Sequence, residues 1–320
     1  MSTQTQLTIK PVVSDDEFQI YALLTQNERP DMIDDVESMK KYDAARPATA
    51  FFERNLIWSG DEPQCGVTML QVYWSSDPTL FEIWLRPKGT VTSEIAQLAL
   101  ASCTEKLLAQ GAKKINVWTP NHHSAWISEL ESNGYQFDQA NPESVLMLND
   151  LDTSPFESNI QAVLDSGLKI TSMADYLAQN PETGWKTIYE MDMEILQDVP
   201  LPYEFTGEPL ETYIESMTVN KDSFNTIHFA QDGDRLVGTS MLFRSKVAKE
   251  FYHTGLTGVL REYRRRGIAS ALKVTNFKLA KEAGGKQITC DNEEKNPMLQ
   301  LNYQLGFKPY WVWHSYTKVL

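Results

Sequence analysis

The sequence predicts an α+β protein (a mixed α/β fold) built from two copies of one unit, and three observations support this. Short motifs recur in the same order in the two halves of the chain. In the second half, segments of strand and helix character follow one another, which indicates helices layered on a sheet. The chain has 320 residues, more than a single hydrophobic core usually serves, so two domains are expected.

Four pairs of segments carry the repeat. Two pairs lie 172 residues apart: residues 65–70 "CGVTML" with 237–242 "VGTSML", and 133–137 "NGYQF" with 305–309 "LGFKP". A third pair places glycine between a helical stretch and a strand, and a fourth places a strand before an acidic helix start: "QGAKKINVW" with "AGGKQITC", and "LTIKPV" with "LKITSM". Such self-similarity is typical of a duplicated structural unit.

The repeat predicts a first domain at residues 1–150 and a second at 151–320. They join around the polar stretch "NDLDTSPFES", whose composition is typical of a linker. Hydrophobic periodicity and the glycine positions predict the elements of the second domain. They are a strand from about 168, helical segments to about 217, a hairpin at 226–243, a strand at 249–259, a helix at 268–283, a strand at 287–291, a helix at 297–304 and a strand at 311–319.

Composition and charge exclude several classes of protein. The net charge of -14 and the pI near 4.9 argue against nucleic acid or an anionic membrane as the main partner. No run of about 18 apolar residues is present, and the start "MSTQTQLTIKPVVSDDE" has no signal-peptide pattern. Three widely spaced cysteines predict no disulfide framework and indicate the cytoplasm. His122 and His123 have no accompanying ligand cluster, so no metal site is expected.

One basic segment differs from the rest of this acidic chain: "EYRRRGIASALK" at residues 262–273. Three adjacent arginines repel one another unless an anion binds among them. The segment lies where a strand turns into a helix, and the first N–H groups of a helix attract anions because they have no internal acceptor. Gly267 lets the backbone approach a bulky ligand, while Ala269 and Ser270 keep the first turn small. The pattern predicts a diphosphate-binding loop that is neither a Walker loop nor a GxGxxG fingerprint.

The same residues resemble the acetyl-CoA motif of the GNAT superfamily of N-acetyltransferases, [QR]-x-x-G-x-[GA], matched by Arg264, Gly267 and Ala269. The preceding "GLTGVLREY" resembles the central strand of that family, and "NPMLQLNYQLGFKP" resembles its later helix and Leu-Gly-Phe turn. The resemblance covers residues 226–320, and the repeat extends it over the chain as in tandem GNAT proteins. It implies two GNAT-like domains, each with a mostly antiparallel mixed sheet, a splayed central strand and flanking helices.

By this resemblance, the second domain binds acetyl-CoA as a co-substrate and acetylates a primary amine of a small molecule or peptide. The pantetheine arm would pair with the edge of the splayed strand, and the diphosphate would lie on the N–H groups of the following loop. The implied binding residues are Thr257, Gly258, Val259, Arg264, Arg265, Arg266, Gly267, Ile268, Ala269, Ser270, Asn296 and Asn302. The chemistry requires an oriented thioester, a donor for the oxyanion and a route for the amine proton.

Several residues are candidates for proton transfer. Many GNAT enzymes use a tyrosine four residues before the glycine of the Leu-Gly-Phe turn, but here that position is Asn302 and Tyr303 lies beside it. His253 lies six residues before Val259, hence on the same face of the strand, and its imidazole suits a general base. The rival bases are Asp291, Glu293, Glu294 and water.

The first domain resembles a degenerate copy. Alignment with the second half places Glu94 where the diphosphate would lie, puts Ser93 at the position of Gly267, and leaves the arginine run without a counterpart. A structural or substrate-shaping role is therefore expected for this domain. For the whole chain, the alternative hypothesis is a non-catalytic CoA-binding sensor or scaffold, and transfer of a longer acyl group is a third.

Overall fold

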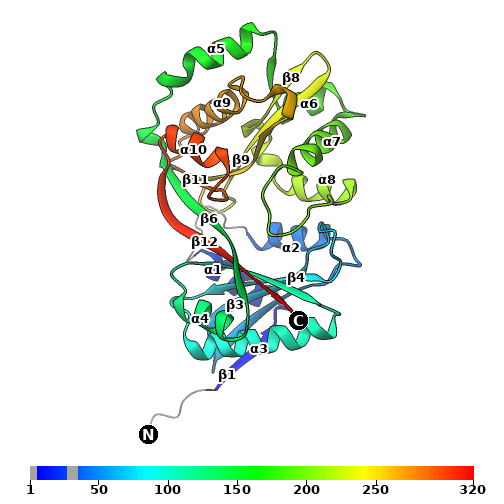
Figure 1. Cartoon of the computed structure of the whole chain (residues 1–320), viewed down its shortest axis with the longest axis vertical. Coiled ribbons are helices and arrows are strands. Elements are labelled where there is room, and N and C mark those ends of the chain that lie inside the picture. Colours follow the sequence, from blue (N-terminus) through cyan, green and yellow to red (C-terminus); the bar gives the residue numbers. More distant parts are fainter. Residues whose placement is uncertain (1–5, 27–34) are drawn as a thin grey trace. The chain divides into compact units, whose positions relative to one another are not determined.

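The computed structural model describes residues 6–26 and 35–320, and it has the predicted α+β class, with helices flanking mixed β-sheet in two compact units. The first unit comprises Met1–Pro142, Pro202–Thr206 and Trp311–Leu320, and the second comprises Glu143–Leu201 and Gly207–Tyr310. Strands and helices follow one another in nearly the same order in the two halves of the chain (Figure 1), as expected for a duplicated unit.

The first unit contains a sheet in the order β1-β2-β3-β4-β5-β12-β6. Strands β1 to β4 are antiparallel, whereas β4 and β5 run parallel. Its elements are β1 (Leu7–Pro11), α1 (Asp15–Thr25), α2 (Val36–Ala45), β2 (Phe52–Ser59), β3 (Glu62–Gln71), β4 (Leu80–Pro87), α3 (Ser93–Ala109), β5 (Lys114–Pro120), α4 (Ser124–Ser132) and the first part of β6 (Gln136–Met147).

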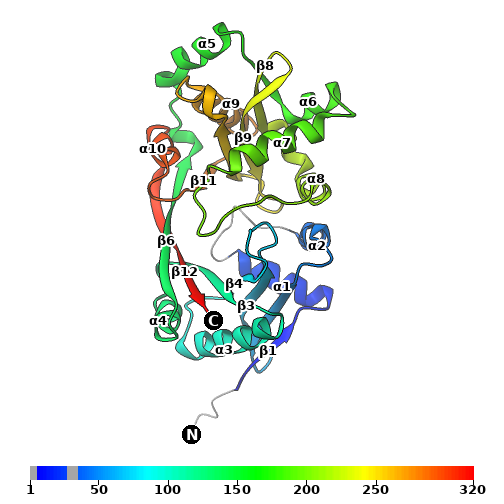
Figure 2. The ribbon, with the colours of Figure 1, turned by 45° about the vertical axis from the view of Figure 1, so that its right-hand side comes forward.

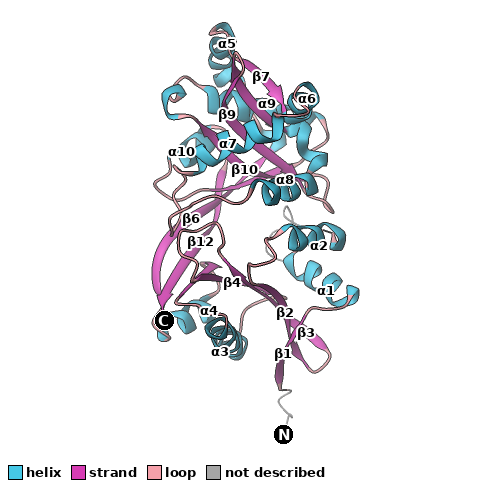
Figure 3. Ribbon diagram, turned by 90° about the vertical axis from the view of Figure 1, so that its right-hand side faces the viewer, coloured by secondary structure: helices cyan, strands magenta, loops and turns pink. Residues whose placement is uncertain are grey.

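The two faces of this sheet are covered by different helices (Figure 3). Val67 and Ile83 pack with α3 residues such as Ala99 in the main core. On the opposite face, a Cβ at Gly66 would lie 2.8 Å from the Tyr21 ring of α1, so glycine is needed for that helix to pack closely. Alternation along the strands therefore directs β4 side chains to α3 and to the other face in turn.

The second unit has strands in the order β6-β11-β10-β9-β8-β7. Its elements are α5 (Glu157–Asp165), β7 (Lys169–Ser172), α6 (Met173–Gln179), α7 (Gly184–Leu196), α8 (Leu210–Val219), β8 (Ile227–Asp232), β9 (Arg235–Arg244), β10 (Phe251–Val259), α9 (Ile268–Glu282), β11 (Gln287–Asp291), α10 (Pro297–Gln304) and the beginning of β12 (Lys308–Val319). The predicted elements are confirmed. Helix α5 was not predicted, and the expected linker forms two short 3₁₀ turns with Phe156 buried in a core cluster.

Helices α7 and α9 cover opposite faces of this sheet (Figure 2). A Cβ at Gly258 on β10 would lie 2.1 Å from Ile195 Cγ2 of α7. On the neighbouring strand, a Cβ at Gly238 would lie 3.4 Å from Ile268 of α9 and 3.3 Å from Val259. Successive β10 residues thus point to α7 and to α9, and Gly258 permits the close approach of α7.

The compact units differ from the expected division at residue 150 in their terminal strands. Residues 143–147 of β6 pair with β11 in the second unit, and Trp313–Val319 of β12 pair with β5 in the first unit. Residues 202–206 also belong to the first unit, where Trp74 Nε1 donates to the Tyr203 hydroxyl at 3.0 Å. Each sheet is therefore completed by chain from the other half of the sequence.

The described residues form neither a membrane-spanning helix nor a cluster of metal ligands. No described helix is both long and apolar enough to cross a membrane. Within residues 6–26 and 35–320, no group of three or more His, Cys, Asp or Glu side chains could hold a metal ion. The His122 and His123 rings contact one another edge to face, with centroids 4.7 Å apart.

Candidate functional site

Strands β10 and β11 separate in the middle of the second unit's sheet. They pair in parallel from Phe251 to His253 on β10, with His253 opposite Thr289, and the pairing ends there. Beyond this point, β10 continues to pair with β9 on its other edge, after an irregularity between Thr254 and Thr257. The strand is therefore splayed as expected: its edge facing β11 leaves the sheet pairing after His253, and at its end the Val259 carbonyl accepts a hydrogen bond from Arg264 Nε.

The loop after β10 has an unusual backbone that sets up the start of α9. Arg265 has a φ of 61° and is a non-glycine residue in the left-handed region, and Gly267, the N-cap of α9, has a φ of 78°. No side chain caps this helix start; the backbone N–H of Ala271 donates to the Gly267 carbonyl. The N–H groups of Ile268 to Ser270 therefore precede the first intrahelical bond and are suited to an anion.

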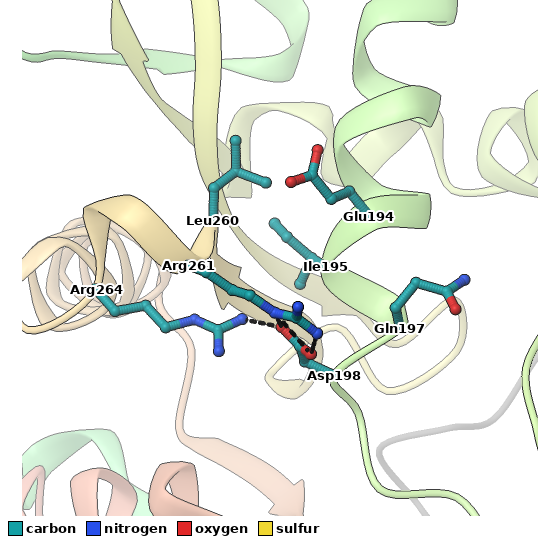
Figure 4. Close-up of a pocket in the computed structure, with 7 residues that line it drawn as sticks. All are labelled: Glu194, Ile195, Gln197, Asp198, Leu260, Arg261 and Arg264. Carbon is teal, nitrogen blue, oxygen red and sulfur yellow. Dashed lines mark hydrogen bonds and ion pairs between the residues drawn. The ribbon is translucent and has the colours of Figure 1, made fainter.

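The four arginines of the loop do not act alike. Arg261 and Arg264 both bond the Asp198 carboxylate just after α7 (Figure 4). Arg264 Nε also donates to the Val259 carbonyl at 2.9 Å. Arg266 turns back to donate to the Glu262 carbonyl at 2.8 Å and packs over the Tyr263 ring. The positive charge that the sequence places here is thus partly neutralised by Asp198, which sequence analysis missed because it lies 63 residues before Arg261.

Two cavities adjoin Asp198. One, of about 140 Å³, is lined by the residues shown in Figure 4. The other, of about 480 Å³, is lined by Gln197–Pro200, Glu293 and Lys295–Pro297. Both share Gln197 and Asp198 in their walls. The space next to the arginine loop therefore extends towards the loop between β11 and α10, where Asn296 was predicted to bind cofactor.

The predicted binding residues Asn296 and Asn302 also have structural roles. Asn296 is the N-cap of α10, and its Oδ1 accepts from the Met298 N–H at 2.9 Å. Asn302 is fully buried and donates to Cys290 Sγ at 3.0 Å and to Asn292 Oδ1 at 2.6 Å. Asn302 thus braces α10 against the end of β11, and a direct contact with cofactor stays a prediction.

The predicted catalytic residues lie on separate elements of the same unit. His253 is half-buried on β10 at the last position paired with β11, and its ring lies 5.3 Å from that of Phe243. Asp291 ends β11 and is exposed. Tyr303 is half-buried on α10 and packs against the core cluster that contains Leu146 and Phe277. Of the three, His253 lies at the point where the strands part. It does not share a face with Val259 as expected, because the irregularity between Thr254 and Thr257 reverses the alternation of side chains along β10.

The corresponding helix in the first unit begins differently. Thr92 is the N-cap of α3 in ordinary extended conformation, and its side chain accepts from the Ile95 N–H at 3.4 Å. Hydrogen bonding from its own backbone N–H lowers the pKa of Glu94 in the first turn. Two helical N–H groups, those of Glu94 and Ile95, are thus already used, and a negative charge sits where an anion would bind. The first unit keeps the helix but has a different N-terminus.

Replacing Asp198 by Asn is expected to lower the free energy of unfolding at pH 7 by about 1 kcal/mol, because two ion pairs are lost while the side chain keeps its shape. Hydrogen bonds from Arg261 and Arg264 hold the pKa of Asp198 well below its ordinary value. The contribution of the two ion pairs to the free energy of unfolding is therefore fully present above the ordinary aspartate pKa of about 4. It is lost as the pH falls through the lowered pKa of Asp198 in the folded state.

The difference between parent and Asp198→Asn should accordingly shrink in acid, which urea unfolding at pH 7 and at about pH 3 would measure. Asp234→Asn, in the exposed turn between β8 and β9, removes the same charge without an ion pair and is the control. An equal difference at both pH values would mean that the ion pairs are not its source.

Comparisons with known proteins agree with this geometry. Residues 185–307 match the acetyltransferase (GNAT) family model. A GCN5-related N-acetyltransferase from Sphaerobacter thermophilus is similar in structure, with a TM-score of 0.69, 15% identity, and coverage of 98% of this chain and 95% of that one. A tandem GNAT protein from the clavulanic acid biosynthesis pathway gives a TM-score of 0.70, 15% identity and 98% coverage of both chains.

A third similar structure is a GCN5-related glucosamine N-acetyltransferase region of a fungal multi-domain β-N-acetylglucosaminidase. Its TM-score is 0.69 at 13% identity, covering 99% of this chain and 38% of that one. Comparison with curated proteins gives no match. At these identities the structures establish a shared fold over the whole chain.

Proposed function

We propose that the second unit transfers an acetyl group from acetyl-CoA to a primary amine of a small molecule or peptide. Its residues 185–307 match the GNAT acetyltransferase family model, and the whole chain has the fold of a tandem GNAT protein. The observation that supports this most is the uncapped start of α9. There, the left-handed backbone at Arg265 and Gly267 presents helical N–H groups in the loop that follows the splayed strand and a short 3₁₀ turn at Arg261–Tyr263.

The residues present fit the chemistry of acetyl-CoA. Its diphosphate is anionic, and the N–H groups from Arg265 to Ser270 would hold it, with the exposed Arg265 adding charge. Its pantetheine arm carries amides, which would pair with the edge of β10 around Thr257, Gly258 and Val259, although the Val259 carbonyl already accepts from Arg264 Nε. When bound, acetyl-CoA supplies the acyl group as an activated thioester.

Proton transfer is the task left to the side chains. The amine must lose a proton as its nitrogen bonds the acyl carbon and the carbon–sulfur bond breaks, and we assign His253 as the acceptor because it lies where β10 and β11 part. Asp291 is the alternative base. Tyr303 is the candidate donor to the departing thiolate, since Asn302 is buried and committed to Asn292 and Cys290.

A direct assay tests the proposed activity. The full chain is incubated with acetyl-CoA and a panel of amines (polyamines, amino sugars, amino acids and basic peptides), and release of free CoA is followed together with the mass of the acetylated product. Release above the amine-free background, with a matching product, supports the transferase. Longer acyl-CoAs in the same assay test the acyl-chain length.

A CoA-binding sensor or scaffold is the second candidate, and one observation favours it. The position at which many GNAT enzymes carry a tyrosine is the buried Asn302, which has no acidic proton to give. Tight binding of CoA, with no amine in the panel raising CoA release, would support the sensor and contradict the transferase.

We expect one CoA per chain, because the first unit's α3 is capped by Thr92 and carries Glu94 in its first turn. We accordingly assign residues 1–150 as a degenerate copy and 151–320 as the acetyl-CoA-binding domain. Calorimetric titration of the full chain would count the sites. Two equivalent CoA sites would contradict the assignment. If a Glu94→Gln variant still binds one CoA, the charge of Glu94 is not by itself what excludes a second CoA from the first unit.

We place the protein in the cytoplasm, and its thiols support this. Cys65, Cys103 and Cys290 are buried, and none of them forms a disulfide bond. Free thiols are kept reduced in the cytosol, where disulfides are rare. The reaction partners proposed here, acetyl-CoA and an amine, require neither nucleic acid nor a membrane.

A further inference from the structure

The first unit buries a carboxylate on the sheet face opposite α3. Glu82, in the middle of β4, is only 3% exposed and pairs across the sheet with Leu70 on β3 and Asn116 on β5. Its neighbour Ile83 points to the main core, so Glu82 points away from it. Carboxylates are rarely fully buried unless they are paired, so this one needs an explanation.

The two oxygens of Glu82 have different surroundings. Trp84 Nε1, two residues along the same strand, donates to Oε2 at 3.1 Å. Trp118 and Tyr203 also act on this carboxylate as hydrogen-bond donors. Among the described residues, Oε1 is buried and has no donor within 3.5 Å, and Glu82 forms no ion pair. Arg46, at the end of α2, acts on it only electrostatically, since its guanidinium packs over the Phe52 ring at 4.2 Å.

Three indole rings gather beside this carboxylate. Trp84 and Trp118 stack with centroids 6.3 Å apart and an interplanar angle of 17°, and Trp313 of β12 lies 6.0 Å from Trp84 at 59°. Trp84 and Trp118 are half-buried to buried and face each other at the last paired position of β4 and β5. This is the place in the first unit that corresponds to His253 and Thr289 in the second.

Aromatic rings and a buried carboxylate without an ion-pair partner together favour one class of ligand, and the Arg86 guanidinium already lies over one of these rings, 5.2 Å from the Trp84 centroid. The faces of indole rings are electron-rich and attract cations, which is how aromatic cages recognise organic ammonium groups. A buried carboxylate supplies the matching charge. An anion would be repelled by Glu82, and a neutral apolar ligand would leave the charge of the carboxylate without a counterion.

We propose that Glu82, Trp84, Trp118 and Trp313, here called the Glu82 box, bind a small organic cation of the alkylammonium class. The site lies wholly within the first unit and is separate from the acetyl-CoA site proposed for the second. It gives the degenerate copy a ligand of its own, at the position where its sheet also splays.

The protonation of Glu82 should be coupled to this binding. Burial raises the pKa of Glu82 to about 7, although hydrogen bonds from Trp84, Trp118 and Tyr203 act to lower it. Two ionisable groups, Arg46 and Tyr203, act on Glu82. Burial raises the pKa of Tyr203 above its ordinary value, so the tyrosine stays neutral. A bound cation favours the carboxylate, so affinity should rise as the pH increases through about 7 and protons should be released on binding below it.

Calorimetric titration of the full chain with choline and with butylammonium tests the proposal. The neutral control ligand is 3,3-dimethylbutan-1-ol, in which carbon replaces the choline nitrogen. At pH 8, at least one cation should bind about 10-fold more tightly than the neutral alcohol and quench tryptophan fluorescence. Glu82→Gln should weaken that binding about 10-fold or more and abolish its pH dependence.

Two controls separate binding from folding and from net charge. Glu62→Gln removes the same charge from an exposed position of β3 in this unit and should leave cation affinity unchanged. Glu82→Gln should keep the parent's cooperative unfolding and its CoA affinity. If neither cation gives a saturable signal, or if Glu82→Gln binds as tightly as the parent, the Glu82 box is not a cation site.

Discussion

Gly267→Val is expected to weaken CoA binding by about 10- to 100-fold. Gly267 has a φ of 78°, which a β-branched residue adopts only at a cost of about 1–3 kcal/mol. A Cβ there would otherwise meet ordinary contacts, the nearest being Asn159 Cβ at 3.5 Å. The substitution should therefore act by changing the backbone that directs the first N–H groups of α9, and not by overfilling a core. Calorimetric titration with CoA measures the effect.

A matched glycine at the other end of the same helix provides the control. Gly284 has a φ of 79°, and a Cβ there would meet nothing within 4 Å. Gly284→Val imposes the same backbone strain just after α9, away from the loop, so it should reduce stability while leaving CoA affinity unchanged. Equal affinities for Gly267→Val and the parent would remove the phosphate-loop hypothesis.

His253→Ala is expected to lower turnover by about 10²- to 10⁴-fold, with CoA affinity nearly unchanged. If this imidazole accepts the amine proton, kcat/KM of the parent should rise through the range in which imidazoles ordinarily titrate, about pH 6–7, and the variant should lose that step. Exogenous imidazole should restore part of the activity. The measurement is the pH dependence of kcat/KM with one good acceptor.

A histidine in the other unit is the control for this experiment. His314 is half-buried on β12, and its removal should leave the pH profile unchanged. Because His253 packs on the Phe243 ring, some stability is expected to be lost with it, and unfolding curves would separate that loss from catalysis. A profile in His253→Ala identical to the parent's would exclude it as the base and leave Asp291 as the candidate.

Local pattern was enough to predict much of the second unit. The strand at Gln287–Asp291 and the helix at Pro297–Gln304 have the bounds expected from glycine positions and periodicity. The helix expected at 268–283 ends one residue earlier, at Glu282. These features depend on neighbours in sequence: the conformational freedom of glycine, the first turn of a helix and the alternation of side chains along a strand.

Two features of the candidate sites could not be predicted from neighbouring residues in the sequence. Asp198 pairs with Arg261 and Arg264 across more than 60 residues, and nothing in the spacing of an acidic residue after a helix identifies its partner. The Glu82 box likewise joins β4, β5 and the C-terminal strand, since Trp313 reaches the first unit only because β12 pairs with β5. Net charge predicted neither contact.

The sequence by itself determined that one α+β unit occurs twice, that a glycine-containing turn opens α9, and that the first copy has a different helix start. Only the tertiary structure decided which arginines remain available, which strands complete each sheet, and where a buried carboxylate meets three indole rings. The physical reason is that turns and periodicity are set by a few consecutive residues. Pairing of charges and strands instead depends on contacts between distant segments, whose partners are chosen by burial and packing of the whole unit.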